Sequence, residues 1–129
     1  GEMARLTGLS VEEIEGERVA VATESAMKWN VVVVLKGAFT VVGTPDGSAT
    51  IAPFVNPAMA SAGTGDVLAG TIAGFLAQGL SPKTAAILGV FVHGRAGEAI
   101  RRRMGDSGLL ASDLLRAIPR TVRRLQGAS

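Results

Sequence analysis

The sequence predicts an α/β fold with a mostly parallel central sheet, of which the chain supplies a part. A continuous apolar run at residues 31–35 is typical of a strand that is buried on both faces, as in parallel sheets. A hairpin pattern and then a series of helical patterns follow it, a succession that is typical of α/β domains. Because only one long strand and one hairpin can be recognised, we expect the 129 residues to belong to a larger domain.

The segment before this apolar run is predicted to be helical. Ser10 and Glu13 have the spacing of a capping box, in which each side chain accepts a hydrogen bond from the other residue's backbone amide. A helix is then expected from about Glu17 to Trp29, because apolar residues recur at helical spacing on one face.

Residues 31–35 form the predicted central strand, and a hairpin is expected after it. Residues 36–37 end the strand and residues 40–42 resume it. Residues 45–47 read Pro-Asp-Gly, which is a strong turn signal. We therefore expect residues 49–52 to return as the second arm of a hairpin.

Helices dominate the remainder of the chain. Residues 56–66 predict a loop, after which apolar spacing predicts a helix that begins at Val67 and ends at Gly79. Residues 81–82 read Ser-Pro, the pattern of an N-cap followed by proline at the first helical position. The helix that they begin is expected to run to about Met104.

Composition limits the classes of protein and site that the chain can form. Cysteine is absent, which excludes disulfides, thiolate zinc sites and a cysteine nucleophile. The formal net charge is only +2, so nucleic-acid binding is not indicated. The charge-free stretch at residues 67–80 is shorter than the ~20 apolar residues of a membrane span. Since Glu2 and Arg5 lie where a signal peptide would be apolar, we expect a soluble, cytoplasmic protein that contacts no membrane.

The strongest local signal is the run Gly63-Thr64-Gly65-Asp66 before a predicted helix. The glycines allow a tight turn, and free amides at the positive end of a helix form a site for a phosphate or another oxyanion. Asp66, in the first helical turn, can accept a proton from a hydroxyl group that attacks phosphorus. It can equally serve as a helix cap alone, and the spacing does not choose between the two roles. The run has neither the spacing nor the lysine of a P-loop.

Residues 36–40, which read Lys-Gly-Ala-Phe-Thr, are the second candidate site. A lysine at the C-terminal end of a buried strand lies where α/β folds bind ligands. There Lys36 can reach a nucleotide phosphate, with Gly37 allowing a close approach of the backbone. A lysine at a strand end more commonly just extends into solvent, and the pattern leaves both interpretations open.

The other polar motifs are interpreted as structural. His93 is the only histidine and falls in an apolar helical segment, which favours a packed or hydrogen-bonded role; one histidine cannot build a His-based metal site, and none is expected. A last helix is expected from about Ser112, and Pro119 is expected to break or kink it. Solvated helix faces are predicted for the arginines Arg101, Arg102, Arg103, Arg120, Arg123 and Arg124.

Four segments of the chain form a recognisable combination. They are Gly-Glu-Met-x-Arg-Leu at residues 1–6, Leu-Lys-Gly-Ala-x-Thr at residues 35–40, Asn-Pro-x-Met-Ala at residues 56–60 and Gly-Thr-Gly-Asp at residues 63–66. The last segment alone is typical of the ribokinase-like superfamily. The combination resembles the C-terminal part of the ADP- or ATP-dependent NAD(P)H-hydrate dehydratases. This resemblance implies a three-layer α/β/α fold with a mostly parallel central sheet, of which residues 1–129 are the C-terminal portion.

The resemblance also implies a cofactor-repair reaction. Hydrated NADH or NADPH would be dehydrated with ADP or ATP and Mg²⁺, by phosphorylation of the ring hydroxyl and elimination of phosphate. Asp66 matches the catalytic aspartate that contacts the hydrate and takes its hydroxyl proton. The positions that match the nucleotide site are Lys36, Gly37, Ala38, Phe39, Thr40, Gly63, Thr64 and Gly65. The positions that match the substrate contacts are Gly1, Glu2, Asn56 and Asp66.

The chain also departs from the family's pattern. Residues 61–62 are Ser-Ala where many relatives carry Thr-Gly, and the superfamily's Asn-x-x-Glu motif is not found in this sequence. We therefore expect activity to need an N-terminal half of the domain. Because relatives in this family are often oligomeric, the resemblance also implies a homo-oligomer. Two other functions stay open. One is a ribokinase-like kinase for a vitamin precursor of the hydroxymethylpyrimidine or hydroxyethylthiazole type, and the other is a non-catalytic binding module.

Overall fold

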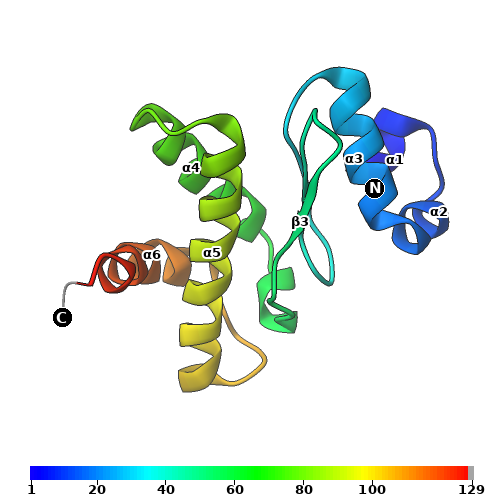
Figure 1. Cartoon of the computed structure of the whole chain (residues 1–129). Helices are drawn as coiled ribbons and strands as arrows, with labels where there is room; N and C mark the ends of the chain where they lie inside the picture. Colours follow the sequence, from blue (N-terminus) through cyan, green and yellow to red (C-terminus); the bar gives the residue numbers. More distant parts are fainter. Residues whose placement is uncertain (128–129) are drawn as a thin grey trace. The chain divides into compact units, whose positions relative to one another are not determined.

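The computed structural model describes residues 1–127, which divide into two compact units. The first unit is Gly1–Ile51 and the second begins at Ala52. Figure 1 colours the chain from its N-terminus in blue to its C-terminus in red. The first unit contains three helices and a small sheet, and the described part of the second unit is helical.

The first unit begins with three helices, α1 (Glu2–Thr7), α2 (Val11–Gly16) and α3 (Arg18–Trp29). The predicted capping box begins α2, where the Glu13 amide donates to Ser10 Oγ (3.1 Å) and the Ser10 amide donates to Glu13 Oε2 (2.7 Å). The prediction of a helix that ends at Trp29 is also confirmed. Helix α1 was not predicted, and it places Glu2 in a first helical turn.

Three short strands follow, β1 (Val33–Leu35), β2 (Val41–Gly43) and β3 (Ala49–Ile51), paired in that order. The predicted hairpin of β2 and β3 is confirmed. The prediction that residues 40–42 resume the first strand is wrong, because β2 turns back and pairs antiparallel with β1. The physical reason is the short connection at residues 36–40, since parallel strands need a crossover of a dozen or more residues. Among residues 1–127 the sheet contains no parallel pair.

Helix α3 packs on this sheet at very short range, and the contact depends on Gly43. A Cβ atom built on Gly43 would lie 2.5 Å from the Ala22 carbonyl oxygen on α3, so only glycine allows the two backbones to approach this closely. Ala22 and Val41 are fully buried at the contact. The buried cluster of the first unit comprises Ile14, Val21, Ala22, Leu35 and Val41, with Phe39 packed against it.

The second unit consists of a short 3₁₀ helix η1 (Pro57–Ala60) and three α-helices, α4 (Thr64–Ala77), α5 (Pro82–Met104) and α6 (Ala111–Leu125). Helix α5 contacts both α4 and α6 (Figure 1). Its glycines receive side chains from other segments of the unit: Ile72 lies against Gly89, Phe54 against Gly94 and Met59 against Gly97. The buried cluster comprises Ala58, Ala96, Ile100, Leu109 and Leu114.

Two predictions for the second unit need correction, whereas the Ser81 cap and the extent of α5 are confirmed. Helix α4 begins at Thr64 rather than at Val67, so residue 65 lies inside the helix and not in the turn before it. Pro119 does not end the last helix, which continues to Leu125. Proline removes one backbone donor, and at this exposed position the carbonyl it leaves unpaired can be hydrated.

Helix α5 is the longest helix in the described chain, with 23 residues, and it ends in three arginines. Neither it nor any other helix within residues 1–127 combines the length and the apolar character that crossing a membrane requires.

Candidate active site

The turn into α4 brings a carboxylate beside unpaired backbone amides. Gly63 is the N-cap, and its φ of 82° is in the left-handed region that favours glycine. The first backbone bond of the helix joins the Val67 amide to Gly63 O at 3.2 Å. The amides of Gly65 and Asp66 precede this bond, and so they belong to the orphan donors of a helix N-terminus. The Asp66 side chain is exposed in this first turn, as predicted.

Thr64 ties the start of α4 to the preceding loop and to α5. Its hydroxyl lies 2.7 Å from Met59 O and 2.8 Å from Ser61 O, so it donates back into the preceding loop. The Thr64 carbonyl lies 2.9 Å from His93 Nε2 on α5. Because a carbonyl can only accept, Nε2 carries the proton of the imidazole. The predicted structural role of His93 is therefore confirmed, and its partner is the first residue of α4.

Asn56 is the third predicted site residue in this unit. Its Oδ1 accepts the Ala58 amide at 3.1 Å and so caps η1. Its Nδ2 is buried and has no hydrogen-bond partner among the described residues. A buried amide donor without an acceptor costs about 1–3 kcal/mol. Because Oδ1 caps η1 and Nδ2 is buried, the structure gives Asn56 a structural role, and its substrate contact stays a prediction.

Asp66 also borders a hollow between α4 and α6. The hollow has a volume of about 420 Å³ and is mostly apolar. Its other lining residues are Val67, Gly70, Thr71, Leu115, Ile118 and Pro119. The carboxylate thus stands at the edge of a surface that can receive an apolar part of a ligand.

The other predicted site residues lie in the first unit. Lys36 Nζ lies 3.8 Å from Glu2 Oε2, so the predicted nucleotide lysine and the predicted substrate carboxylate meet. Both side chains are at least half exposed, and an ion pair of this kind contributes little to stability. Gly1, Glu2 and Lys36 are among the residues that line a hollow of about 330 Å³ beside β1.

Arg18 is a residue of this unit that sequence reasoning missed. It lies on α3, and its Nη2 donates to Leu35 O (3.0 Å) and to Phe39 O (2.9 Å), at the two ends of residues 36–40. The available signal was its position: the buried face of α3 consists of Arg18, Val21, Ala22, Ser25 and Ala26. An arginine on a helix face that otherwise carries only small or apolar residues indicates a buried partner.

The described residues do not form a metal cage. Within residues 1–127 no three histidine or acidic side chains lie close enough together to hold a metal ion. Mg²⁺ is commonly held by one or two carboxylates together with substrate phosphates. Asp66 beside the free amides fits magnesium that arrives with a nucleotide, rather than a resident metal.

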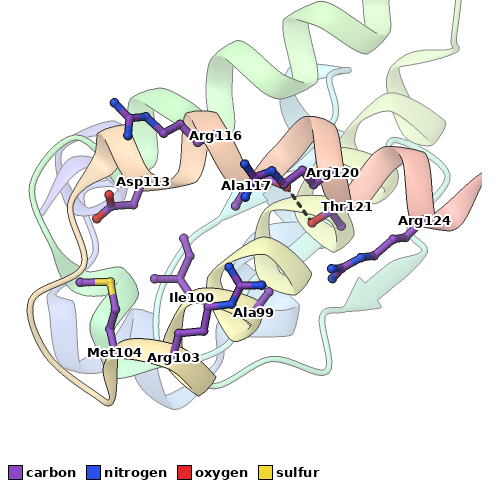
Figure 2. A pocket seen from close by; sticks show the side chains of 10 residues that line it. All are labelled: Ala99, Ile100, Arg103, Met104, Asp113, Arg116, Ala117, Arg120, Thr121 and Arg124. Carbon is purple, nitrogen blue, oxygen red and sulfur yellow. Dashed lines mark hydrogen bonds between the residues drawn. The ribbon is translucent and has the colours of Figure 1, made fainter. Parts of the chain in front are cut away.

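A basic groove lies between α5 and α6, where arginines surround a volume of about 180 Å³ (Figure 2). Four arginines line it, Arg103, Arg116, Arg120 and Arg124, together with the single carboxylate of Asp113. All four arginines are exposed, as the sequence predicts for Arg103, Arg120 and Arg124. Outside the groove, Arg101 is paired, and hydrogen bonds to Glu98 and Asp106 raise its pKa above the ordinary value.

Comparison with solved structures identifies proteins whose fold is similar to that of this chain. A ribokinase-like superfamily protein from Enterococcus faecalis V583 has a TM-score of 0.78 at 32% identity, over 95% of this chain and 41% of that one. The crystal structure of ADP/ATP-dependent NAD(P)H-hydrate dehydratase from Bacillus subtilis, co-crystallised with ATP/Mg²⁺, has a TM-score of 0.91 at 39% identity, over 96% of this chain and 45% of that one. The predicted fold class, a ribokinase-like α/β fold of which this chain supplies a part, is thereby confirmed.

The sequence comparisons identify the family. The bifunctional NAD(P)H-hydrate repair enzyme Nnr of Moorella thermoacetica is 47% identical over 126 residues, which are 98% of this chain and 24% of that protein. A family model described as NAD(P)H-hydrate dehydratase matches residues 1–120. The chain belongs to the NAD(P)H-hydrate dehydratase family. It spans less than half the length of these relatives.

Proposed function

We propose that the protein containing this chain dehydrates hydrated NADH and NADPH at the expense of ADP or ATP. The observation that carries the proposal is the position of Asp66, an exposed carboxylate in the first turn of α4 next to free backbone amides. Membership of the NAD(P)H-hydrate dehydratase family supports it. The Bacillus subtilis relative that was crystallised with ATP/Mg²⁺ supports an adenine nucleotide with Mg²⁺ as the phosphoryl donor.

In the proposed reaction, the amides at the start of α4 bind the terminal phosphate of the nucleotide. Asp66 accepts the proton of the ring hydroxyl. The hydroxyl oxygen forms a bond to the terminal phosphorus, and the bond between that phosphorus and the rest of the nucleotide breaks. The carbon–oxygen bond of the resulting ester then breaks and phosphate leaves. Loss of a ring proton restores the double bond of the reduced nicotinamide.

The remaining predicted residues receive supporting roles in this proposal. The nucleotide contacts are Lys36, Gly37, Ala38, Phe39, Thr40, Gly63, Thr64 and Gly65. The contacts to the hydrate are Gly1, Glu2, Asn56 and Asp66.

The chain is proposed to act as the C-terminal portion of one domain, together with an N-terminal half. The matched relatives are more than twice as long as the segment they share with this chain, which supports this view. A homo-oligomeric, cytoplasmic protein is part of the same proposal, since it rests on the resemblance to the family.

The test is recovery of the near-ultraviolet absorbance of reduced nicotinamide from hydrated NADH, with Mg²⁺ and either ADP or ATP. The chain is assayed alone and with the N-terminal half of the domain restored. Asp66→Asn is expected to abolish recovery while nucleotide binding persists, because the proton acceptor is lost. Asp113→Asn is the matched control, since Asp113 occupies the same position in the first turn of α6.

Three outcomes would contradict the proposal. An active Asp66→Asn protein would exclude the assigned role of that carboxylate. Accumulation of a stable phosphorylated product would favour a small-molecule kinase. Absence of nucleotide-dependent heat in calorimetry, with the N-terminal half restored, would favour a binding module without catalysis.

A further inference from the structure

Residues 36–40 rest on the side chain of Arg18. This side chain is only 4% exposed although it is charged. Its Nη2 donates both to Leu35 O at 3.0 Å, just before the loop, and to Phe39 O at 2.9 Å, near its end. One nitrogen atom thus holds together the two ends of the predicted nucleotide loop.

Gly37 and Phe39 of the loop also lie against the Arg18 guanidinium. A Cβ atom built on Gly37 would lie 2.5 Å from both Nη1 and Nη2 of Arg18, so the guanidinium occupies the space that a side chain at position 37 would need. The Phe39 ring centroid lies 5.3 Å from Arg18 Cζ, within the range of a cation–π contact. Glycine at position 37 is therefore explained by Arg18, apart from any contact with a ligand.

The buried charge and the loop conformation depend on each other. A buried guanidinium is costly unless its donors are paired. Nη1 pairs with Glu15 at 2.8 Å, and that carboxylate is half exposed. The buried Nε has no partner among the described residues, so the rest of the compensation comes from Nη2 and the carbonyls of Leu35 and Phe39. If the loop moved, these donors would lose their acceptors.

The same bonds set the direction of the loop's amides. In a trans peptide the C=O and N–H groups point in opposite directions within one plane. The carbonyls of Leu35 and Phe39 point at Arg18. The N–H groups of Lys36 and Thr40 therefore point away from the buried guanidinium.

We propose that Arg18 is a positioning residue, which holds residues 36–40 in the conformation that receives the adenine nucleotide. This inference rests on the proposed function, which assigns nucleotide contacts to that loop. Arg18 does not touch the nucleotide in this scheme. It lowers the cost of binding, because a loop that is already ordered loses less conformational entropy when the ligand arrives.

The test compares Arg18→Met and Arg18→Lys with the parent protein, with the N-terminal half restored. Methionine removes every donor, and lysine keeps the charge but replaces the planar fork by a single ammonium group. Amide hydrogen exchange of residues 37–40 is expected to accelerate about tenfold in Arg18→Met and less in Arg18→Lys. KM for ADP is expected to rise about tenfold in Arg18→Met, while kcat changes by less than about twofold, because the conformational entropy lost on ordering one residue corresponds to roughly this factor.

Two control variants separate positioning from general destabilisation. Ala26→Gly weakens α3 about two turns further along the helix, through helix propensity and lost packing. Glu15→Gln removes the half-exposed ion pair but keeps both bonds to the loop carbonyls. Neither variant is expected to change exchange at residues 37–40 or KM for ADP.

The inference is overturned if Arg18→Met exchanges at residues 37–40 as slowly as the parent, or if Ala26→Gly loosens the loop equally. It is also overturned if the loop loosens while KM for ADP stays constant. A parent protein that shows no nucleotide-dependent dehydration would count against the proposed function instead. The exchange rates would still decide whether Arg18 holds the loop.

Discussion

Replacing Gly43 by alanine is expected to destabilise the first unit by pushing α3 away from β2. The added Cβ would lie 2.5 Å from Ala22 O, 2.6 Å from Ala22 C and 3.0 Å from the Thr23 nitrogen. All three are backbone atoms, so no side-chain rotation can relieve the contact. Because non-bonded carbon contacts are optimal at about 3.5–4.0 Å, the helix must move by roughly 1 Å.

The magnitude follows from two opposing effects. Overpacking a buried site costs about 1–3 kcal/mol, and the high end applies because Ala22 is fully buried. Replacing glycine reduces the entropy of the unfolded chain, which offsets about 0.4–1 kcal/mol. The free energy of unfolding is therefore expected to fall by about 2 kcal/mol.

The assay is urea denaturation followed by circular dichroism, with Gly16→Ala as the matched control. Gly16 ends α2 in the same unit, and a Cβ atom there meets nothing within 4 Å. The control is expected to stabilise the protein by about 0.5 kcal/mol. If the two variants proved equally stable, the backbones of α3 and β2 would not be in close contact, and the steric argument would be refuted.

Two further predictions concern His93 and Glu13. His93→Leu removes the donor to Thr64 O and is expected to lower the affinity for ADP about fivefold, measured by calorimetry. His93→Gln keeps an amide donor and is expected to retain the parent's affinity. An equal loss of affinity in both variants would contradict the role of this hydrogen bond. The Ser10 amide lowers the pKa of Glu13 below its ordinary value. A carboxyl group whose pKa is lower in the folded state stabilises the folded protein at pH values above its unfolded-state pKa. This contribution is lost as the pH falls through the folded-state pKa. Denaturation between about pH 6 and 3 should therefore show a steeper loss for the parent than for Glu13→Gln, and parallel curves would contradict the assignment.

The elements that the sequence predicts well are those encoded within a few neighbouring residues. The capping box at Ser10 and Glu13 and the cap at Ser81 are complete in three or four positions. The hairpin between β2 and β3 is signalled by its own turn. For these features no distant contact is needed.

The reversal between β1 and β2 could not be read in the same way. An apolar run of valines indicates a strand but does not say which strand lies beside it. Arg18, which bonds to both ends of the reversal, lies 17 residues before Leu35 and 21 residues before Phe39 in the chain. Only the folded structure brings that guanidinium to the loop.

In the candidate site, too, features encoded by neighbouring residues are predicted and features that depend on distant contacts are not. The position of Asp66 in a first helical turn follows from local pattern, and the structure agrees. The bond from His93 to Thr64 O spans 29 residues, and the burial of Asn56 Nδ2 depends on packing that no local pattern records. Sequence motifs therefore locate the candidate site residues better than the residues that hold them in place.

The glycines of α5 carry a consequence for the natural variation of this family. Each of them receives one particular side chain: Phe54 at Gly94, Met59 at Gly97 and Ile72 at Gly89. A larger residue at position 94 can persist only if position 54 becomes smaller in the same lineage, and the same holds for the other two pairs. Homologous sequences should therefore show correlated substitution at 54 with 94, 59 with 97 and 72 with 89, with the summed side-chain volume of each pair nearly constant.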